Sequence, residues 1–527
     1  MKNRSKRIIC CILAFQIFYF NPHSIAYTAS KSSKKIKPPK VRLRNALSAE
    51  EKFYKGDFEG AALFFETLDR KKNRNCALFN NQLGSIYMAK GDCEKALDSF
   101  LKAYYLMNDI SAFENLESGA VSLFGSEARK AYKGDPYEKV FNSLYVGLLL
   151  ANKGDFDNAS AAFKNGILCD SDVKDELYGS DVSALYLFAA RLALKQNNSS
   201  LSKDYFNKAT KSYRLASPLN RSIVSQEQAL VTLLYEKQKE LKKLEKFGRR
   251  FKRKKKKGTT MSGTDKASGE KSKTTLTYNK KTLGKIKVLS EEIEELDENI
   301  KELSSQREVN SRNINTSILK SFTDLKNNTF LCLELGRGPL KYQTGHYGQL
   351  AVFTVKPHKI SEIKVFLDDE EFSKNLLLLD NDIFFQARTR GGREMDNILK
   401  GQAQFKQTTA ETSLAFYQAS QNIQKQANQM SSANPYYDAS GQYAAAGILA
   451  LVSLAIAITS AAANPVADVK HWSLLPGNII ILPFSMKIGT HNIKIDCYSK
   501  KGNLLNSSKF SVEIEEKKDN IFFKRFF

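Results

Sequence analysis

The chain has 527 residues, of which 42% are hydrophobic and 26% are charged, an ordinary balance for a globular protein. This length excludes a protein with one simple hydrophobic core and predicts about three domains. The formal net charge of +25 is unusual, and it favours a nucleic acid, an anionic membrane surface or an acidic protein as partner. Much of the positive charge is concentrated in residues 31–44 and 237–257.

Residues 1–26 have the organisation of a secretory signal peptide. Four basic residues precede an apolar run over residues 8–20, and Ser24 and Ala26 supply the small side chains that a signal peptidase requires. The apolar run is short for a membrane span, which favours a cleaved signal over an uncleaved anchor. A basic linker over residues 27–46 follows. We therefore expect an exported protein, periplasmic or bound to the cell envelope, and no nucleic-acid partner.

The remaining cysteines and histidines do not form a recognisable chemical motif. Five cysteines are sparse and odd in number, which excludes a disulfide framework. Cys332 and Cys497 both fall in segments with strand character, so a disulfide between them and two buried free thiols are both compatible with the sequence. The sequence lacks a Cys/His cluster, a phosphate-binding loop and a nucleophile elbow. We expect a protein that is not an enzyme, with no cofactor, no metal and no catalytic residue.

A repeat begins near residue 50. The segment Gly56–Ala61 recurs as Gly91–Ala96, and 91 − 56 gives a period of 35 residues. The second copy carries small and aromatic residues at the positions of the tetratricopeptide (TPR) pattern, namely Leu83, Gly84, Tyr87, Gly91, Ala96, Phe100 and Ala103. This segment resembles the TPR family. The small residues Gly84 and Ala96 allow two helices to approach closely, and the aromatic rings fill the space between them.

Further copies of the repeat are centred on Gly154 and Asn197, which predicts a TPR array of four or five helix pairs over residues 47–215. Stacked pairs produce a curved groove, and Asn81, Ser85 and Met88 are expected on its inner side. These residues do not form the Lys/Arg/Asn clamp that some TPR proteins use for a C-terminal carboxylate. Two interpretations remain open, a groove for a protein partner and a spacer array without a ligand.

Residues 222–310 have the pattern of a coiled-coil hairpin. Two stretches with apolar residues at spacings of three and four flank a polar segment over residues 249–283, which we expect to be a disordered basic loop. An antiparallel pairing fits the acidic second helix and the Lys-rich first helix, and a dimeric coiled coil is the alternative. The loop begins with a basic run, which is either a solvated segment or an anionic-membrane contact, and its members are Arg249, Arg250, Lys252, Arg253 and Lys254.

Residues 325–527 are predicted to form an antiparallel, β-sandwich-like region with a helical insertion over residues 393–465. The expected strands are residues 330–335, 350–355, 363–367, 478–483, 492–498 and 509–514. Within the insertion, residues 444–463 are apolar and long enough for a membrane span. A span would place the two sets of strands on opposite sides of a membrane. This favours a helix that is docked on the sheet, either buried or in contact with lipid.

The segment Ala467–Pro476, together with residues 328–341, resembles an uncharacterised family of exported bacterial proteins. Members of that family join TPR-like helices to a β-rich region with an Ala-rich helical insertion. Their usual Thr and Arg are replaced here by Val469 and Lys470. The resemblance implies no known activity, and it implies that Asp468, Trp472 and Pro476 organise the fold.

Together these patterns predict a multidomain α+β protein with an N-terminal α-solenoid, a coiled-coil hairpin and a β-rich region. The expected function is a cell-envelope scaffold that binds other proteins through its TPR groove. The alternative is a membrane-associated assembly or pore-like component that uses the Ala-rich helix over residues 444–463 and forms oligomers.

Overall fold

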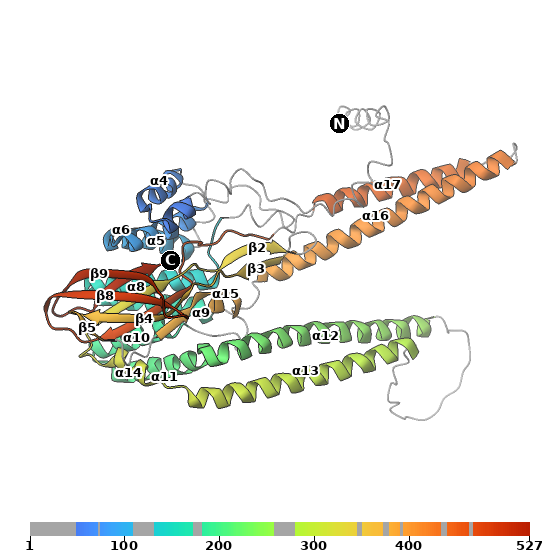
Figure 1. Cartoon of the computed structure of the whole chain (residues 1–527). Coiled ribbons are helices and arrows are strands. Elements are labelled where there is room, and N and C mark those ends of the chain that lie inside the picture. The colour runs from blue at the N-terminus through green and yellow to red at the C-terminus, as the bar shows by residue number, and fades with distance from the viewer. Residues whose placement is uncertain are drawn as a thin grey trace, which may run out of the picture.

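The computed structural model describes residues 49–71, 74–108, 131–171, 182–257, 280–344, 350–372, 379–389, 394–433, 440–462 and 467–527. Over these residues the fold is mixed α+β, with helices up to residue 323 and strands interrupted by long helices after it (Figure 1). This confirms the mixed α+β character that the sequence predicted. The predicted signal peptide and the basic linker lie outside the described residues.

The first part of the chain is an array of helix pairs. The described residues contain four pairs, which are 49–54 with α4 (Phe58–Asp69), α5 (Cys76–Lys90) with α6 (Cys93–Asn108), α8 (Pro136–Lys153) with α9 (Phe156–Ser171), and α10 (Ser183–Lys195) with α11 (Ser199–Ala216). Gly56, Gly91 and Gly154 make the turns within the first three pairs with φ of 85°, 87° and 85°. Asn197 takes this place in the fourth pair with φ of 59°. Glycine, and less often asparagine, tolerates this left-handed conformation, so the predicted repeat turns are confirmed.

In two of the pairs, a glycine of the first helix packs against a phenylalanine of the second helix of the same pair. A Cβ atom on Gly84 would lie 2.3 Å from the ring of Phe100, and one on Gly147 would lie 2.4 Å from the ring of Phe163. These distances are too short for any larger side chain, so both positions require glycine. Leu83, Ala96 and Ala103 are buried in the same interface, whereas Tyr87 is half-buried and its hydroxyl donates to Glu66. The residues predicted to pack the second repeat thus lie at or near contacts between α5 and its neighbouring helices.

A long antiparallel hairpin follows the array, formed by α12 (Pro218–Lys257) and α13 (Lys280–Asn313). Lys237 Nζ lies 2.6 Å from Glu292 Oε2, and Arg307 Nε donates to Glu227 Oε2 over 3.0 Å. These pairs run in opposite directions along the two helices, so the predicted antiparallel hairpin is confirmed.

The predicted limits of the basic loop were wrong. Residues 249–257 continue α12, and residues 280–283 belong to α13. Lysine and arginine are good helix formers, so a helix that has already begun propagates through them. The remaining part of the predicted loop, residues 258–279, lies outside the described residues.

Strands follow the short helix α14 (Ser317–Thr323) and build two four-stranded sheets and a hairpin. The first sheet has the order β10-β1-β7-β6, the second has the order β5-β4-β8-β9, and β2 pairs with β3. The strands are β1 (Thr329–Leu335), β2 (Leu340–Thr344), β3 (Leu350–Thr354), β4 (Ile360–Leu367), β5 (Glu370–Glu371), β6 (Leu379–Asp382), β7 (Asn478–Phe484), β8 (Gly489–Ser499), β9 (Leu504–Ile514) and β10 (Asn520–Phe526).

The first sheet is the middle layer of the molecule. On one face, Leu333 and Leu482 share a hydrophobic cluster with Ile495 of the second sheet. On the other face, Phe330 and Ile481 pack into the core of the helical array. Alternate residues of one strand point to opposite faces, so β1 is buried along its whole length.

One expectation for this region was wrong, and one pair of alternatives is now distinguished. The sheet is not purely antiparallel, because β10 pairs with β1 in parallel; the long stretch of chain between the two strands allows such a crossover. Cys332 and Cys497 do not form a disulfide. Cys332 faces the helical array, whereas Cys497 lies in the cluster between the two sheets. Burial raises the pKa of both thiols.

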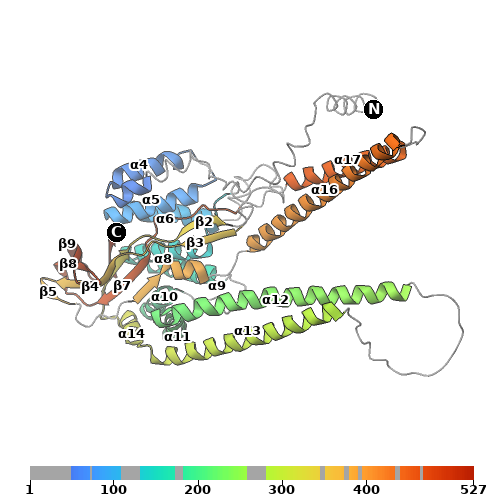
Figure 2. The ribbon, with the colours of Figure 1, turned by 45° about the vertical axis from the view of Figure 1, so that its right-hand side comes forward.

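After the short helix α15 (Ile383–Thr389), a second hairpin is formed by α16 (Glu394–Ala433) and α17 (Ser440–Ala462). Figures 1 and 2 show that both long hairpins project from the same side of the body. The expectation that residues 444–463 dock on the sheet was wrong, because α17 packs along α16 instead. Over the described part of the chain, no helix combines the length and the apolar character needed to cross a membrane.

Candidate functional site

The inner face of the helical array, defined here by the first helices of its first three pairs, is covered by residues 467–477 of the same chain. This docked segment leads from the α16–α17 hairpin into β7. It contacts helix 49–54, α5 and α8 in turn through side chains that project from each helix. Residues 472–477 are buried, so the array binds its own chain where a free partner was expected.

Trp472 is the centre of the docked segment. Its side chain is fully buried, with its ring centroid 5.5 Å from that of Phe100 and 5.9 Å from that of Tyr145. The indole Nε1 donates to Ser85 Oγ over 2.9 Å. The backbone N–H of Trp472 donates to a carboxylate oxygen of Glu138. A buried tryptophan has a large apolar surface to cover and one N–H donor that needs an acceptor. The inner face provides the rings of Phe100 and Tyr145 for the first and the Ser85 hydroxyl for the second.

The next two residues of the docked segment are held by polar groups of the first two pairs. Gln82 donates from Nε2 to Ser473 Oγ over 3.0 Å and accepts the N–H of Leu474 over 3.1 Å. The Ser473 hydroxyl donates to Glu50, and the Ser473 carbonyl accepts from the Tyr54 hydroxyl. Gln82 therefore contacts both the backbone and a side chain of the docked segment.

The three residues predicted for the groove are all buried, with exposed fractions of 0% for Asn81, 6% for Ser85 and 3% for Met88. Ser85 contacts the docked segment directly. Asn81 instead accepts from Asn142 of α8 over 2.8 Å, and Met88 packs in the core of the array. The structure thus places one of the three against the docked segment, and none of them is accessible from solvent.

A buried ion pair fixes the other side of the docked segment. Arg525 of β10 donates to Glu334 of β1 over 3.3 Å, and it also donates to the carbonyl of Leu475 over 3.2 Å. Glu334 in turn accepts from the hydroxyl of Tyr145. This chain of contacts joins the first sheet, the docked segment and α8 into one polar network inside an otherwise apolar layer.

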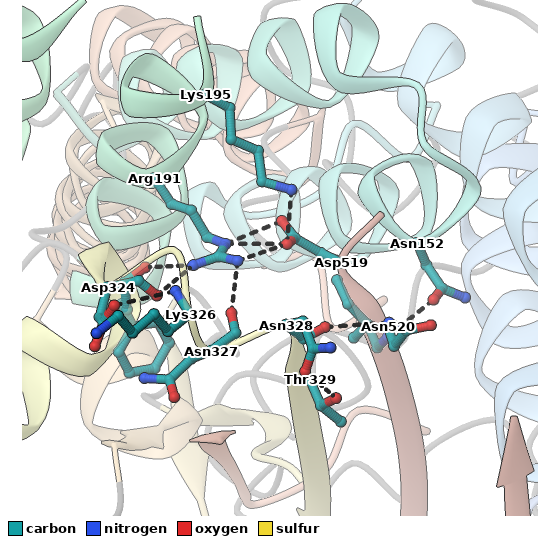
Figure 3. A network of polar contacts seen from close by, with 12 residues as sticks. Asn152, Arg191, Lys195, Asp324, Lys326, Asn327, Asn328, Thr329, Asp519 and Asn520 are labelled. Carbon is teal, nitrogen blue, oxygen red and sulfur yellow. Dashed lines mark hydrogen bonds and ion pairs between the residues drawn. The ribbon is translucent and has the colours of Figure 1, made fainter. Parts of the chain in front are cut away.

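A second buried network clasps the end of the array to the β-region (Figure 3). Arg191 of α10 donates to both carboxylate oxygens of Asp519, which precedes β10. Its remaining donors reach the carbonyls of Phe322, Asp324 and Asn327. Lys195 Nζ lies 2.8 Å from Asp519. Every N–H of the guanidinium is therefore satisfied, as a buried cation requires.

Glu138 sits where the array meets the docked segment and is fully buried. Its carboxylate accepts backbone N–H groups from Trp472 and, over 2.6 Å, from Asp135. Burial, followed by the nearby charge of Asp135, raises the pKa of Glu138 to about 7. The folded protein therefore holds this proton to a higher pH than the unfolded chain does.

This difference makes the stability of the folded protein dependent on pH. Because the folded-state pKa of Glu138 is raised from 4.5 to about 7, its contribution to stability is present below pH 4.5 and is lost as the pH rises to about 7. The loss is on the order of 3 kcal/mol. We expect the free energy of unfolding of the native protein to fall more between pH 5 and pH 8 than that of Glu138→Gln. Parallel falls in urea titrations would contradict this, and the exposed substitution Glu94→Gln is the control.

The basic run over residues 249–254 lies at the far end of α12, away from the inner face (Figures 1 and 2). The five residues predicted to contact a membrane belong to α12, the first helix of the hairpin. The structure therefore does not bring the predicted groove and the predicted membrane contact together.

Sequence reasoning missed the charged residues of both networks. Arg191 stands alone among apolar residues of α10, and Glu334 interrupts the apolar run of β1. An isolated charge in a buried element requires a partner, and this pattern was the available clue. Among the described residues, no group of three or more His, Cys, Asp or Glu is arranged to hold a metal ion.

Comparison with known proteins adds no relative. No family model matches the chain, and no curated protein and no solved structure matches it significantly. The chemistry of the site therefore rests on its geometry, which is that of an intramolecular binding interface.

Proposed function

We propose that this protein is an exported, non-enzymatic scaffold of the cell envelope. Its TPR-like array and sandwich-like β-region form a closed body, and this body presents two long helical hairpins. The observation that carries the proposal is the docked segment, which buries Trp472 against the inner face. With the inner face engaged by the chain itself, the hairpins are the extended surfaces that remain for binding.

The first hairpin is suited to an anionic membrane surface. Its far end carries the basic run from Arg249 onward, and the hairpin holds this run well away from the body (Figure 2). Each basic residue near such a surface contributes about 1 kcal/mol. Anionic headgroups attract the basic run and relieve the repulsion among its charges. Salt screens this attraction, so attachment is expected to weaken as the salt concentration rises.

The test is co-sedimentation of the purified protein with phosphatidylcholine vesicles in which about a third of the lipid is anionic phosphatidylglycerol. We expect binding at low salt and release at about 0.5 M salt. A variant with glutamine at the five predicted contacts should lose most of this binding, and those positions are Arg249, Arg250, Lys252, Arg253 and Lys254.

The matched control removes the same number of charges from scattered exposed positions, namely Lys55, Lys71, Lys153, Lys500 and Lys501. This control should retain most of the binding, because its charges are not concentrated at one end of a hairpin. Equal losses in the two variants, or no binding by the unchanged protein, would reject the membrane attachment.

A second candidate function is a membrane-associated assembly component built on α17. The observation that favours it is the exposure of large apolar side chains on this helix, with Ile448 62% exposed and Leu451 69% exposed. Such residues are normally covered in the working form of a protein. A pore-like assembly requires α17 to enter a bilayer, whereas a soluble assembly requires only contact between copies.

A further inference from the structure

The seam of the α16–α17 hairpin is built from small residues. Ser413, Ser420 and Ala427 of α16 are buried at intervals of seven residues, and Ala446 and Ser453 of α17 are buried with the same interval. Ser413 and Ser453 each donate to the other's carbonyl over 2.9 Å, and Ser420 donates to the Ala446 carbonyl over 2.8 Å. The pairing thus relies on close approach and hydroxyl hydrogen bonds instead of large apolar side chains.

The other hairpin shows the opposite and more usual arrangement. Its seam buries large apolar residues, including Leu289 and Leu296 of α13, and ion pairs such as Lys237 with Glu292 flank it. In water, a helical hairpin gains stability by burying such residues. Among the described side chains of the α16–α17 hairpin, the fully buried ones are small, whereas large apolar ones such as Ile448 and Leu451 are exposed.

The outward side of α17 carries an apolar stripe, defined here as Ala444, Ile448, Leu451 and Val452. All four are exposed. At 100° per residue, the stripe lies on the side of the helix opposite the seam residues Ala446 and Ser453. Its spacing of three and four residues is that of a helix surface which packs against another helix.

The partner helix argues against a position of this stripe in the interior of a bilayer. Glu411, Gln418 and Lys425 of α16 are exposed and lie along the stretch that pairs with α17. A charged residue in the centre of a bilayer costs about 2.5–3.5 kcal/mol even on the most permissive scale. Because the serine hydrogen bonds keep α16 beside α17, insertion of the hairpin across a bilayer would carry these polar residues into the bilayer interior.

We propose that the stripe of α17 binds the same stripe of a second copy of this chain. From Ser440 to Ala462 the helix has no charged residue, whereas the whole chain has a net charge of +25. Two copies therefore meet along α17 without the repulsion that their other surfaces impose. The small residues Ala444 and Gly447 allow close approach, and a two-fold axis makes the contact self-complementary.

The shape of the molecule permits this contact. With 40 residues, α16 extends over about 60 Å, and it carries α17 away from the body in both views (Figures 1 and 2). An antiparallel contact between two copies of α17 places the two bodies at opposite ends. The inference does not depend on attachment to a membrane, so failure of either proposal leaves the other standing.

The experiment is sedimentation equilibrium of the purified protein over a range of concentrations. We expect dimers that dissociate on dilution, and a shift of the Kd by at least tenfold in the double variant Ile448→Gln/Leu451→Gln. The control Leu283→Gln/Val288→Gln makes the same kind of change at residues of α13 that are 54% and 53% exposed. This control should dimerise like the unchanged protein. Circular dichroism should show equal helix content in all three proteins.

Three results would overturn the proposal. One is a protein that stays monomeric at every concentration. A second is a stripe variant that dimerises as tightly as the control. The third is binding to neutral phosphatidylcholine vesicles that the stripe variant loses while the unchanged protein stays monomeric in solution, which would assign the stripe to lipid.

Discussion

Replacing Arg191 by methionine is expected to lower the free energy of unfolding by about 3–5 kcal/mol, the usual cost of removing one partner from a buried ion pair. The Arg191 side chain is 1% exposed, and it donates to both carboxylate oxygens of Asp519. Methionine has a similar length but no donor. Asp519 would keep Lys195 as its only cationic contact among those described here, and the carbonyls of Phe322 and Asn327 would lose their donor.

Urea titration followed by circular dichroism measures this loss. The control is Lys102→Met, which removes a surface ion pair with Asp98 in which the side chains are 54% and 66% exposed. Exposed pairs contribute about 0–1 kcal/mol, so the control should unfold almost like the unchanged protein. A loss of stability in Arg191→Met no larger than that of the control would mean that the Arg191–Asp519 network does not hold the array to the β-region.

The local structure of the helical part could be predicted from the sequence because the residues that determine it lie close together in the chain. The left-handed turn at position 91 requires glycine, and the close contact with Phe100 requires glycine at position 84. These two positions in one repeat are therefore enough to predict the helix pair. The hairpin of α12 and α13 was readable for the same reason, since its apolar spacing and its complementary charges lie within single helices.

The candidate site could not be derived in this way because its contacts join distant parts of the chain. Trp472 and Ser85 are 387 residues apart, and Arg191 and Asp519 are 328 residues apart. Spacing within one segment carries no information about such pairs. The isolated charges at Arg191 and Glu334 indicated that partners existed, but they did not indicate which residues those partners were.

The position of α17 was mispredicted for a related reason. Its apolar composition indicated burial, and the nearest apolar surface known from the sequence was the sheet. Its actual neighbour, α16, is polar on its outer side, and its fully buried side chains over the described stretch are small, such as Ser420. Composition does not distinguish a helix buried in its own fold from one covered by a second molecule.

Replacing Trp472 by alanine is expected to lower the free energy of unfolding by about 3–5 kcal/mol, as for other fully buried aromatic residues. It should also release the docked segment. The N–H groups of Trp472 and Leu474 donate to Glu138 and Gln82, and these bonds protect both amides from exchange only while the indole holds the segment in place. Hydrogen exchange followed by mass spectrometry should therefore show faster exchange in residues 467–477 and in α5.

Two comparisons make this prediction specific. Trp472→Phe keeps an apolar ring but leaves Ser85 without the indole donor, so it should cost less and keep the segment protected. Tyr235→Ala removes an aromatic ring that is 65% exposed and should change stability by no more than about 0.5 kcal/mol. Unchanged protection in Trp472→Ala would mean that the backbone bonds alone dock the segment. Faster exchange confined to the segment and the inner face would mean that one side chain keeps this surface closed to other proteins, and that a partner for the inner face has to displace Trp472.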